Sequence, residues 1–108
     1  MSGLPSFYSE FRDTHPEVAK AYEALGETAR AAGPLTAREI TLVKLALAAG
    51  ARIEGAIHSH ARRALEAGVR PEELRHVPLL AITTLGFPSA MAIRALIEDV
   101  IPPAAPAA

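Results

Sequence analysis

The sequence predicts an all-α fold, and two observations support this prediction. Residues typical of strands are sparse and never alternate with polar ones, whereas the helix-favouring residues Ala, Leu, Glu and Arg are plentiful. Capping residues, glycines and prolines also divide the chain into segments of helical length. Because 50% of the 108 residues are hydrophobic and 21% are charged, we expect a single domain with a well-buried core.

The expected helices begin at caps or prolines and end at glycines or prolines. A short helical segment is expected in residues 5–12. Pro16 suits a first helical position, and the helix that follows it stops at Gly33. Thr36 and Glu39 form the T-x-x-E signature of a capping box, so the next helix should begin there and end at Gly50.

Three further helices are expected over residues 52–68, from Pro71 onward, and from near Pro88 to Ile101. Pro78 would remove a backbone hydrogen bond within the second of these, and we expect a kink or a break there. The single domain, residues 1–108, would then comprise an N-terminal helical region (5–33), a core region (34–101) and a frayed tail, PPAAPAA (102–108).

The helix over residues 36–50 is apolar on almost every face. After Glu39 only Thr41 and Lys44 interrupt its apolar residues. A helix of this kind must be covered on all sides, which a bundle of about five short helices can scarcely achieve alone. We therefore expect an obligate homo-oligomer.

Composition excludes several function classes. A net charge of -1 means that the chain has no excess of positive charge to bind nucleic acid or an anionic membrane, so neither is expected as a partner. The chain has no cysteine, which excludes disulfides, a thiolate nucleophile and a cysteine-containing metal site. Its start does not resemble a secretion signal, and no apolar run approaches the roughly 20 residues that span a bilayer, so a cytoplasmic location is expected.

Residues 52–68, RIEGAIHSHARRALEAG, hold the candidate chemistry. Glu54 and His58 are four residues apart, at one edge of the apolar arc of this helix, whereas His60 falls near its centre. The two histidines are about 200° apart around the helix and cannot share a metal ion, and no H-E-x-x-H motif is present, so no metal is expected. The Glu54–His58 pair is either a surface interaction or part of a site, and His60 has either a packing or a supporting role.

A longer pattern resembles a known family. The stretch REITLVKLALAAGARIEGAIHSHARRALEAGVRPEELRHV, followed by GFPSAMAIRAL, is similar to the carboxymuconolactone decarboxylase family, which includes the AhpD-like alkylhydroperoxidases. The similarity covers roughly residues 34–100. It implies an all-α, AhpD-like bundle of about five to six helices that assembles into trimers or hexamers, with sites near subunit contacts.

The resemblance assigns individual residues. Arg38 and Glu39 match the family's Arg-Glu pair, and His58 matches its active-site histidine. Positions that hold a C-x-x-C pair in the peroxidase-like branch are Ala51 and Glu54 here, so a thiol-dependent alkylhydroperoxidase is excluded. The decarboxylase branch commonly has glutamate four positions before the histidine, as in this chain.

Two departures bear on the substrate. His76 stands where the family usually has an acidic residue, and Gly55 replaces the usual leucine after the glutamate. Neither departure identifies the substrate, and the role of His76 also stays open.

The implied activity is that of a cofactor-free lyase of aromatic catabolism, acting on a small carboxylated lactone or a related ring-cleavage product. His58 would donate or accept the proton, and Glu54 or Glu39 would orient it. Arg38 and Arg62 would bind a substrate carboxylate. The alternative is a non-catalytic oligomeric or ligand-binding member of the family. Catalysis needs His58 accessible and beside a carboxylate, whereas a scaffold protein could leave it packed and dry.

Overall fold

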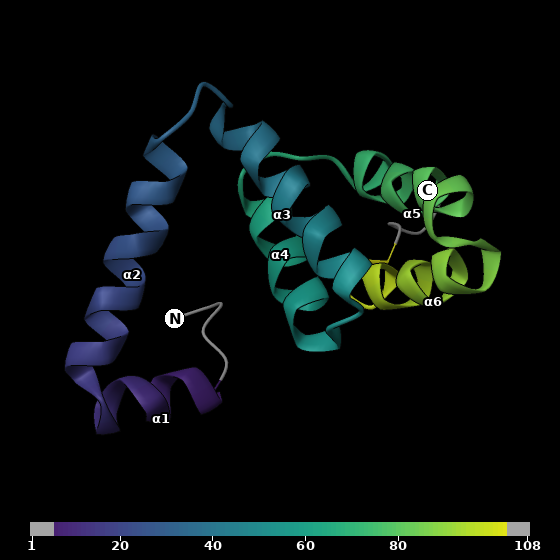
Figure 1. The fold of residues 1–108 in the computed structure, drawn as a ribbon. Helices are drawn as coiled ribbons and strands as arrows, with labels where there is room; N and C mark the ends of the chain where they lie inside the picture. Colours follow the sequence, from purple (N-terminus) through teal and green to yellow (C-terminus); the bar gives the residue numbers. More distant parts are fainter. Residues whose placement is uncertain (1–5, 104–108) are drawn as a thin grey trace, which may run out of the picture. The chain divides into compact units, whose positions relative to one another are not determined.

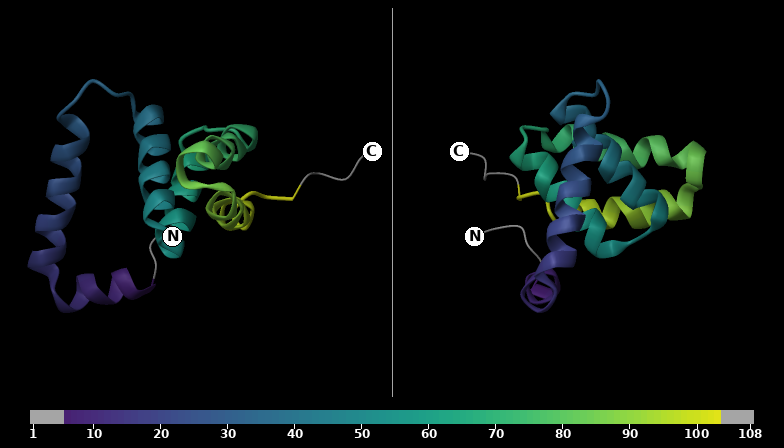
Figure 2. Two further views of the ribbon diagram at one scale, coloured as in Figure 1. Left: turned by 45° about the vertical axis from the view of Figure 1, so that its right-hand side comes forward. Right: turned by 60° about the vertical axis from the view of Figure 1, so that its left-hand side comes forward.

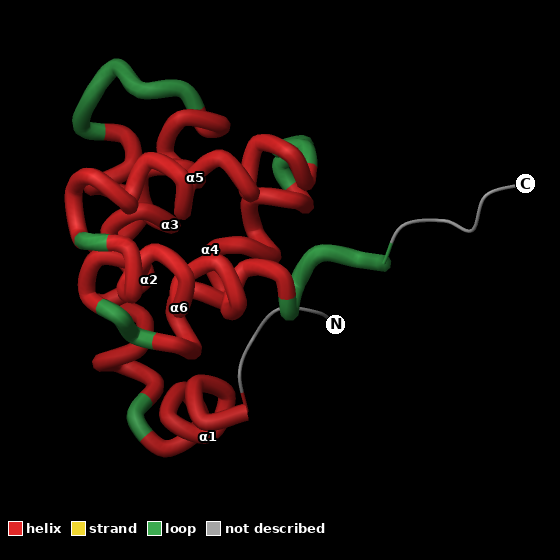
Figure 3. The backbone as a smooth tube through the Cα atoms, turned by 90° about the vertical axis from the view of Figure 1, so that its right-hand side faces the viewer, coloured by secondary structure: helices red, strands yellow, loops and turns green. Residues whose placement is uncertain are grey.

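The structure, a computed structural model, describes residues 6–103, and it is helical without any strand in that range (Figures 1 and 3). The helices of the described residues are α1 (Ser6–Thr14), α2 (Pro16–Ala31), α3 (Ala37–Ala51), α4 (Glu54–Glu66), α5 (Pro71–Leu85) and α6 (Phe87–Glu98). The all-α prediction is confirmed. Residue 5 and residues 104–108, most of the expected tail, lie outside the described residues.

The chain divides into two compact units, Met1–Thr36 and Ala37–Ala108. The boundary falls between Thr36 and Ala37, where the capping signature predicts that α3 begins. The assignment of the whole chain to a single domain stays a prediction.

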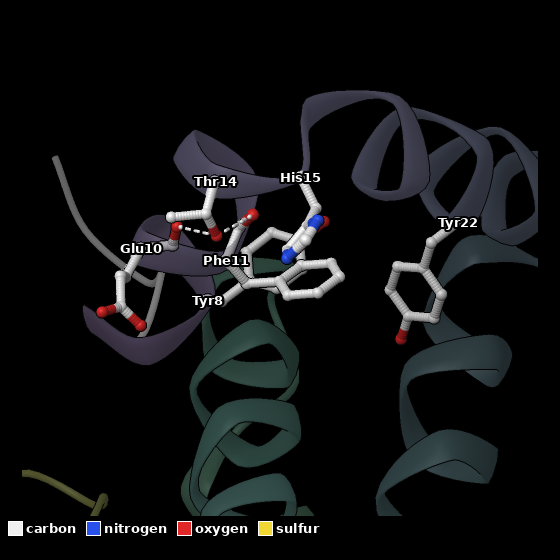
Figure 4. A pocket seen from close by; sticks show the side chains of 6 residues that line it. All are labelled: Tyr8, Glu10, Phe11, Thr14, His15 and Tyr22. Atoms are coloured by element: carbon white, nitrogen blue, oxygen red, sulfur yellow. Dashed lines mark hydrogen bonds between the residues drawn. The ribbon is translucent and has the colours of Figure 1, made fainter.

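The first unit is held by few contacts. Ala19 on α2 is the only buried side chain among those described in it. The Tyr8 hydroxyl donates a 2.6 Å hydrogen bond to Glu23, and the rings of Tyr8 and Tyr22 lie 6.3 Å apart. The side chains of Tyr8, Phe11 and Tyr22 line an open hollow between α1 and α2 (Figure 4).

The second unit consists of two helical hairpins. Helices α3 and α4 lie side by side in opposite directions, α5 and α6 form the second pair, and α4 packs against α6 (Figure 2). The core at this junction includes fully buried branched side chains from several helices: Leu45, Ile57, Leu74, Ile93 and Ile97. Burying one such side chain contributes about 1.5–3 kcal/mol, so this core fixes the two hairpins against each other.

Tight turns end α3 and α4 in the same way. The backbone N–H of Ile53 donates to Ala48, and that of Val69 to Ala64, across residues with positive φ. The left-handed residue is Gly68 after α4, with φ of 92°, but Arg52 after α3, with φ of 59°. Glycine is usual at this position, so an arginine there is a departure that needs a local reason.

Of the kink or break expected at Pro78, the break does not occur. Helix α5 continues through this residue from Pro71 to Leu85. Pro78 is buried on the same face as Leu74 and Ala81, so packing against the core holds the helix together where one backbone hydrogen bond is missing.

Candidate functional site

Helix α4 places His58 at the edge of the core. The neighbouring Ile57 is fully buried, as are Ala61 and Ala64 on the following turns, and these residues fix the orientation of the helix. The His58 side chain is 23% exposed, so solvent or a small ligand can reach the ring. This is the accessible position that a catalytic histidine requires.

The carboxylate beside His58 comes from Asp99. The His58 Nε2 atom lies 3.1 Å from Asp99 Oδ2, between α4 and the end of α6. Sequence analysis did not select Asp99, because it is 41 residues from His58 along the chain. One signal was available: Glu98 and Asp99 are acidic residues at a helix C-terminus, where the helix dipole disfavours negative charge.

A second polar contact joins α6 to the turn that precedes α4. The Arg52 guanidinium donates a 2.9 Å hydrogen bond to the Ser89 hydroxyl. Arg52 therefore tethers this turn to the first turn of α6, a function that glycine at this position could not perform. With the His58–Asp99 contact, it is the second polar side-chain contact described between α6 and the α4 region.

Arg38 lies at a different place, at the start of α3. Its guanidinium forms an ion pair with Glu73 in the first turn of α5. The backbone N–H of Arg70 and the Arg38 side chain lower the pKa of Glu73, in that order of effect, so this carboxylate remains ionised. Arg38 is 46% exposed, and guanidinium has five N–H donors, so further donors remain for a ligand.

An apolar groove runs between α3 and α5, with a volume of about 760 Å³. Aliphatic side chains line most of it, including the exposed Leu47 and Leu80. Its polar lining comes from Glu73, His76 and Thr84. His76, the residue that departs from the family pattern, thus faces a groove that His58 does not line.

The other candidate residues are dispersed over the α3–α4 hairpin. Glu39 lies in the first turn of α3 and Glu54 in the first turn of α4, and both are exposed. Because these helices are antiparallel neighbours (Figure 1), the two residues lie near opposite ends of the hairpin. Helix α3 rises about 18 Å between Glu39 and Ala51. Arg62 is exposed on α4, one turn after His58.

His60 has a different environment from His58. It is half-buried, and burial lowers its pKa, with Arg63 and Lys44 adding to the effect. A neutral imidazole is therefore favoured at this position. Among the residues that the structure describes, no group of three or more histidine or acidic side chains is placed to hold a metal ion.

These features define an all-helical protein of paired hairpins with an accessible histidine–carboxylate pair at the junction between them. The sequence matches the model of the carboxymuconolactone decarboxylase family over residues 16–99. The chain belongs to this family. Searches of curated proteins and of solved structures gave no significant match. No helix within residues 6–103 is long and apolar enough to cross a membrane.

Proposed function

We propose that the protein is a cofactor-free decarboxylase-like lyase that acts on a small carboxylated lactone or a related ring-cleavage product, with His58 as proton donor or acceptor. The observation that supports this most directly is the environment of His58. Its ring is partly exposed and contacts a carboxylate at 3.1 Å, as catalysis requires, whereas a purely structural histidine could be packed away from solvent.

The proposed reaction needs only proton transfer and charge stabilisation. The bond between the ring carbon and the substrate carboxylate breaks, carbon dioxide leaves, and the electron pair moves into the conjugated carbonyl to give a dienolate. His58 then delivers one proton to carbon, and solvent restores that proton to the ring. The substrate's own carbonyl accepts the electrons, so the proposal includes no cofactor.

Two arginines are candidates for the substrate carboxylate. Arg62 follows His58 by one turn on the same helix, so it lies on the side of α4 that a ligand at His58 would reach. Arg38 can bind a carboxylate only with the N–H groups that Glu73 leaves available. We propose Arg62 and Arg38 as binding residues, and Glu39 and Glu54 as the further site carboxylates that the family pattern implies.

A second candidate function is ligand binding without catalysis. The groove between α3 and α5 supports it, because a volume of about 760 Å³ with a few polar groups is typical of small-molecule sites. His76 would then be the residue that contacts the ligand, and His58 would have no role in binding.

We also propose that the protein works in the cytoplasm as a trimer or hexamer. Val43, Leu47, Leu80 and Leu85 are exposed along the groove, and Leu47 is the most exposed of them at 68%. Large exposed apolar patches mark interaction surfaces, and association of subunits would cover this one.

The experiment that tests the proposed activity is a decarboxylation assay with muconolactone-type carboxylates, in which carbon dioxide release is measured. His58→Gln should lower kcat by on the order of 10²-fold or more, because it removes the proton-transfer group. His76→Gln is the matched control, since it changes the histidine of the groove. The ligand-binding alternative would be favoured if His76→Gln lost binding of the carboxylate while His58→Gln bound it as the wild type does. A His58→Gln variant with unchanged carbon dioxide release would contradict the proposed activity.

A further inference from the structure

Asp99 occupies a position that helix electrostatics disfavours. It is the C-cap residue of α6, directly after Glu98, and α6 has no basic residue in its last turn. Arg94, one turn earlier on α6, acts electrostatically on Glu98. Carboxylates at a helix C-terminus meet the negative end of the helix dipole. The structure gives each of the two a cationic or hydrogen-bond-donating partner on another helix.

The partners are on different helices. Glu98 accepts hydrogen bonds of 2.9 and 3.2 Å from Arg75 on α5, whereas Asp99 contacts His58 on α4. The two adjacent carboxylates thus contact different helices. Arg75 and Glu98 form an ordinary ion pair between neighbouring helices, and the second pair involves the histidine of the proposed site.

The contact determines the hydrogen-bonding state of the ring. An ionised carboxylate has no proton and can only accept. His58 Nε2 must therefore carry the hydrogen that bridges the 3.1 Å to Asp99 Oδ2. The other ring nitrogen, Nδ1, then releases a proton when the ring is protonated and accepts one when the ring is neutral.

Both backbone positions of the pair are fixed by the core. Ile57, next to His58, is fully buried, and Ile97, two residues before Asp99, is 1% exposed. The carboxylate is thereby held at a defined place relative to the ring, although Asp99 itself is 60% exposed.

We propose that Asp99 is the positioning residue of His58: it accepts a hydrogen bond from Nε2–H, holds the ring, and leaves Nδ1 as the nitrogen that exchanges a proton with the substrate. This inference rests on the proposed function of His58. It assigns to Asp99 the orienting role that the sequence pattern suggests for Glu39 or Glu54. Asp99 acts through the ring and does not touch the substrate.

The test compares Asp99→Ala with Glu98→Gln, which removes the adjacent negative charge and leaves the histidine contact in place. The first readout is the NMR spectrum of the His58 ring nitrogens at about pH 8.5, where a histidine of ordinary pKa is neutral. The wild type and Glu98→Gln should show the proton on Nε2 with a hydrogen-bonded Nε2–H signal. Asp99→Ala should lose that signal and show faster exchange of the ring proton with water.

The second readout is the division of the effect between kcat and KM. Asp99→Ala should lower kcat by on the order of tenfold to a hundredfold with little change in KM, because a misplaced ring impairs proton transfer more than binding. Glu98→Gln should change kcat less than about twofold by the same reasoning. Asp99→Glu should restore part of the lost kcat, since the longer side chain keeps an acceptor near Nε2.

Three results would overturn the inference. These are a wild-type ring with its proton on Nδ1, ring spectra that Asp99→Ala leaves unchanged, and altered spectra accompanied by a normal kcat. Failure of the proposed function would look different: His58→Gln would retain wild-type turnover, or the wild type would show none. The ring spectra alone would then decide whether Asp99 holds the histidine.

Discussion

At the scale of single residues, two histidines on one helix have different environments. His58 is partly exposed and contacts a carboxylate, whereas His60 is half-buried near cationic side chains. The first arrangement suits proton exchange with a ligand, and the second suits packing. The prediction that His58 and not His60 belongs to the site can therefore be tested by comparing variants of the two histidines.

His58→Ala should abolish turnover or ligand binding and leave the melting temperature nearly unchanged, because the side chain lies at the edge of the core. His60→Ala should retain turnover and cost about 1 kcal/mol of unfolding free energy, since it removes a half-buried ring. Thermal melting and turnover assays on both variants check this. Equal loss of activity in the two variants would contradict the assignment.

His60 also gives the protein a pH-dependent stability. Burial and the nearby cations lower its pKa below the ordinary 6.5, so the unfolded chain binds more protons than the folded one just below that pH. The contribution of His60 is therefore fully present above pH 6.5 and is lost as pH falls through the folded-state pKa.

The measurement is the unfolding free energy of the wild type and His60→Gln at about pH 7.5 and about pH 5.5, on either side of the usual histidine pKa. The wild type should lose more stability than the variant on acidification. Identical losses would show that His60 does not titrate differently in the folded protein.

The sequence could point to some candidate residues and not to others, for a physical reason. His58 and Arg38 were selected as candidates because helical periodicity and the family pattern are local properties of the chain, and their roles in a site stay predictions. Asp99 was missed because its contact with His58 depends on how α6 packs against α4, and packing between distant segments leaves no fixed spacing in the sequence. The same holds for Glu73, the partner of Arg38.

At the scale of elements, the helix boundaries follow caps and breakers closely. Pro16 and Pro71 begin α2 and α5, and α3 begins after Thr36, as expected. Of the kink or break expected at Pro78, the break does not occur, because tertiary packing on a buried face offsets the loss of one backbone hydrogen bond. Local signals therefore predicted where helices begin, and the core decided whether one continues.

The turn between α5 and α6 depends on Gly86, whose φ of 97° and ψ of 154° lie in a region that is essentially restricted to glycine. Gly86→Ala should cost about 1–3 kcal/mol of unfolding free energy through backbone strain, although no atom obstructs the added Cβ.

Gly50→Ala is the matched control, because Gly50 is helical and its added Cβ also meets open space. That substitution should stabilise the protein by about 0.5–1 kcal/mol. Chemical denaturation of both variants tests the pair. A Gly86→Ala variant as stable as the wild type would show that the turn adopts another conformation.

At the scale of the whole molecule, the proposed association rests on exposed apolar side chains. Leu47 and Leu80 are 68% and 61% exposed on the groove between α3 and α5. We expect a trimer or hexamer by light scattering at micromolar concentration, and Leu47→Glu with Leu80→Glu should dissociate it if this face is an interface. Lys20→Glu, on the charged face of α2, is the control and should leave the assembly intact.

A stable monomer of the wild-type protein would contradict the proposed assembly. An oligomer that tolerates both glutamates would place the interface on another surface, such as the exposed apolar side chains of α2, Val18, Tyr22 and Leu25.

The most direct test of the central claim, that His58 meets a small carboxylate ligand, is an NMR titration of the histidine rings with a muconolactone-type carboxylate. The four histidines serve as internal controls for one another. The ring signals of His58 should shift and saturate, while those of His15, His60 and His76 change little. Saturable shifts at His76 with none at His58 would place the ligand in the groove between α3 and α5 and would contradict the account.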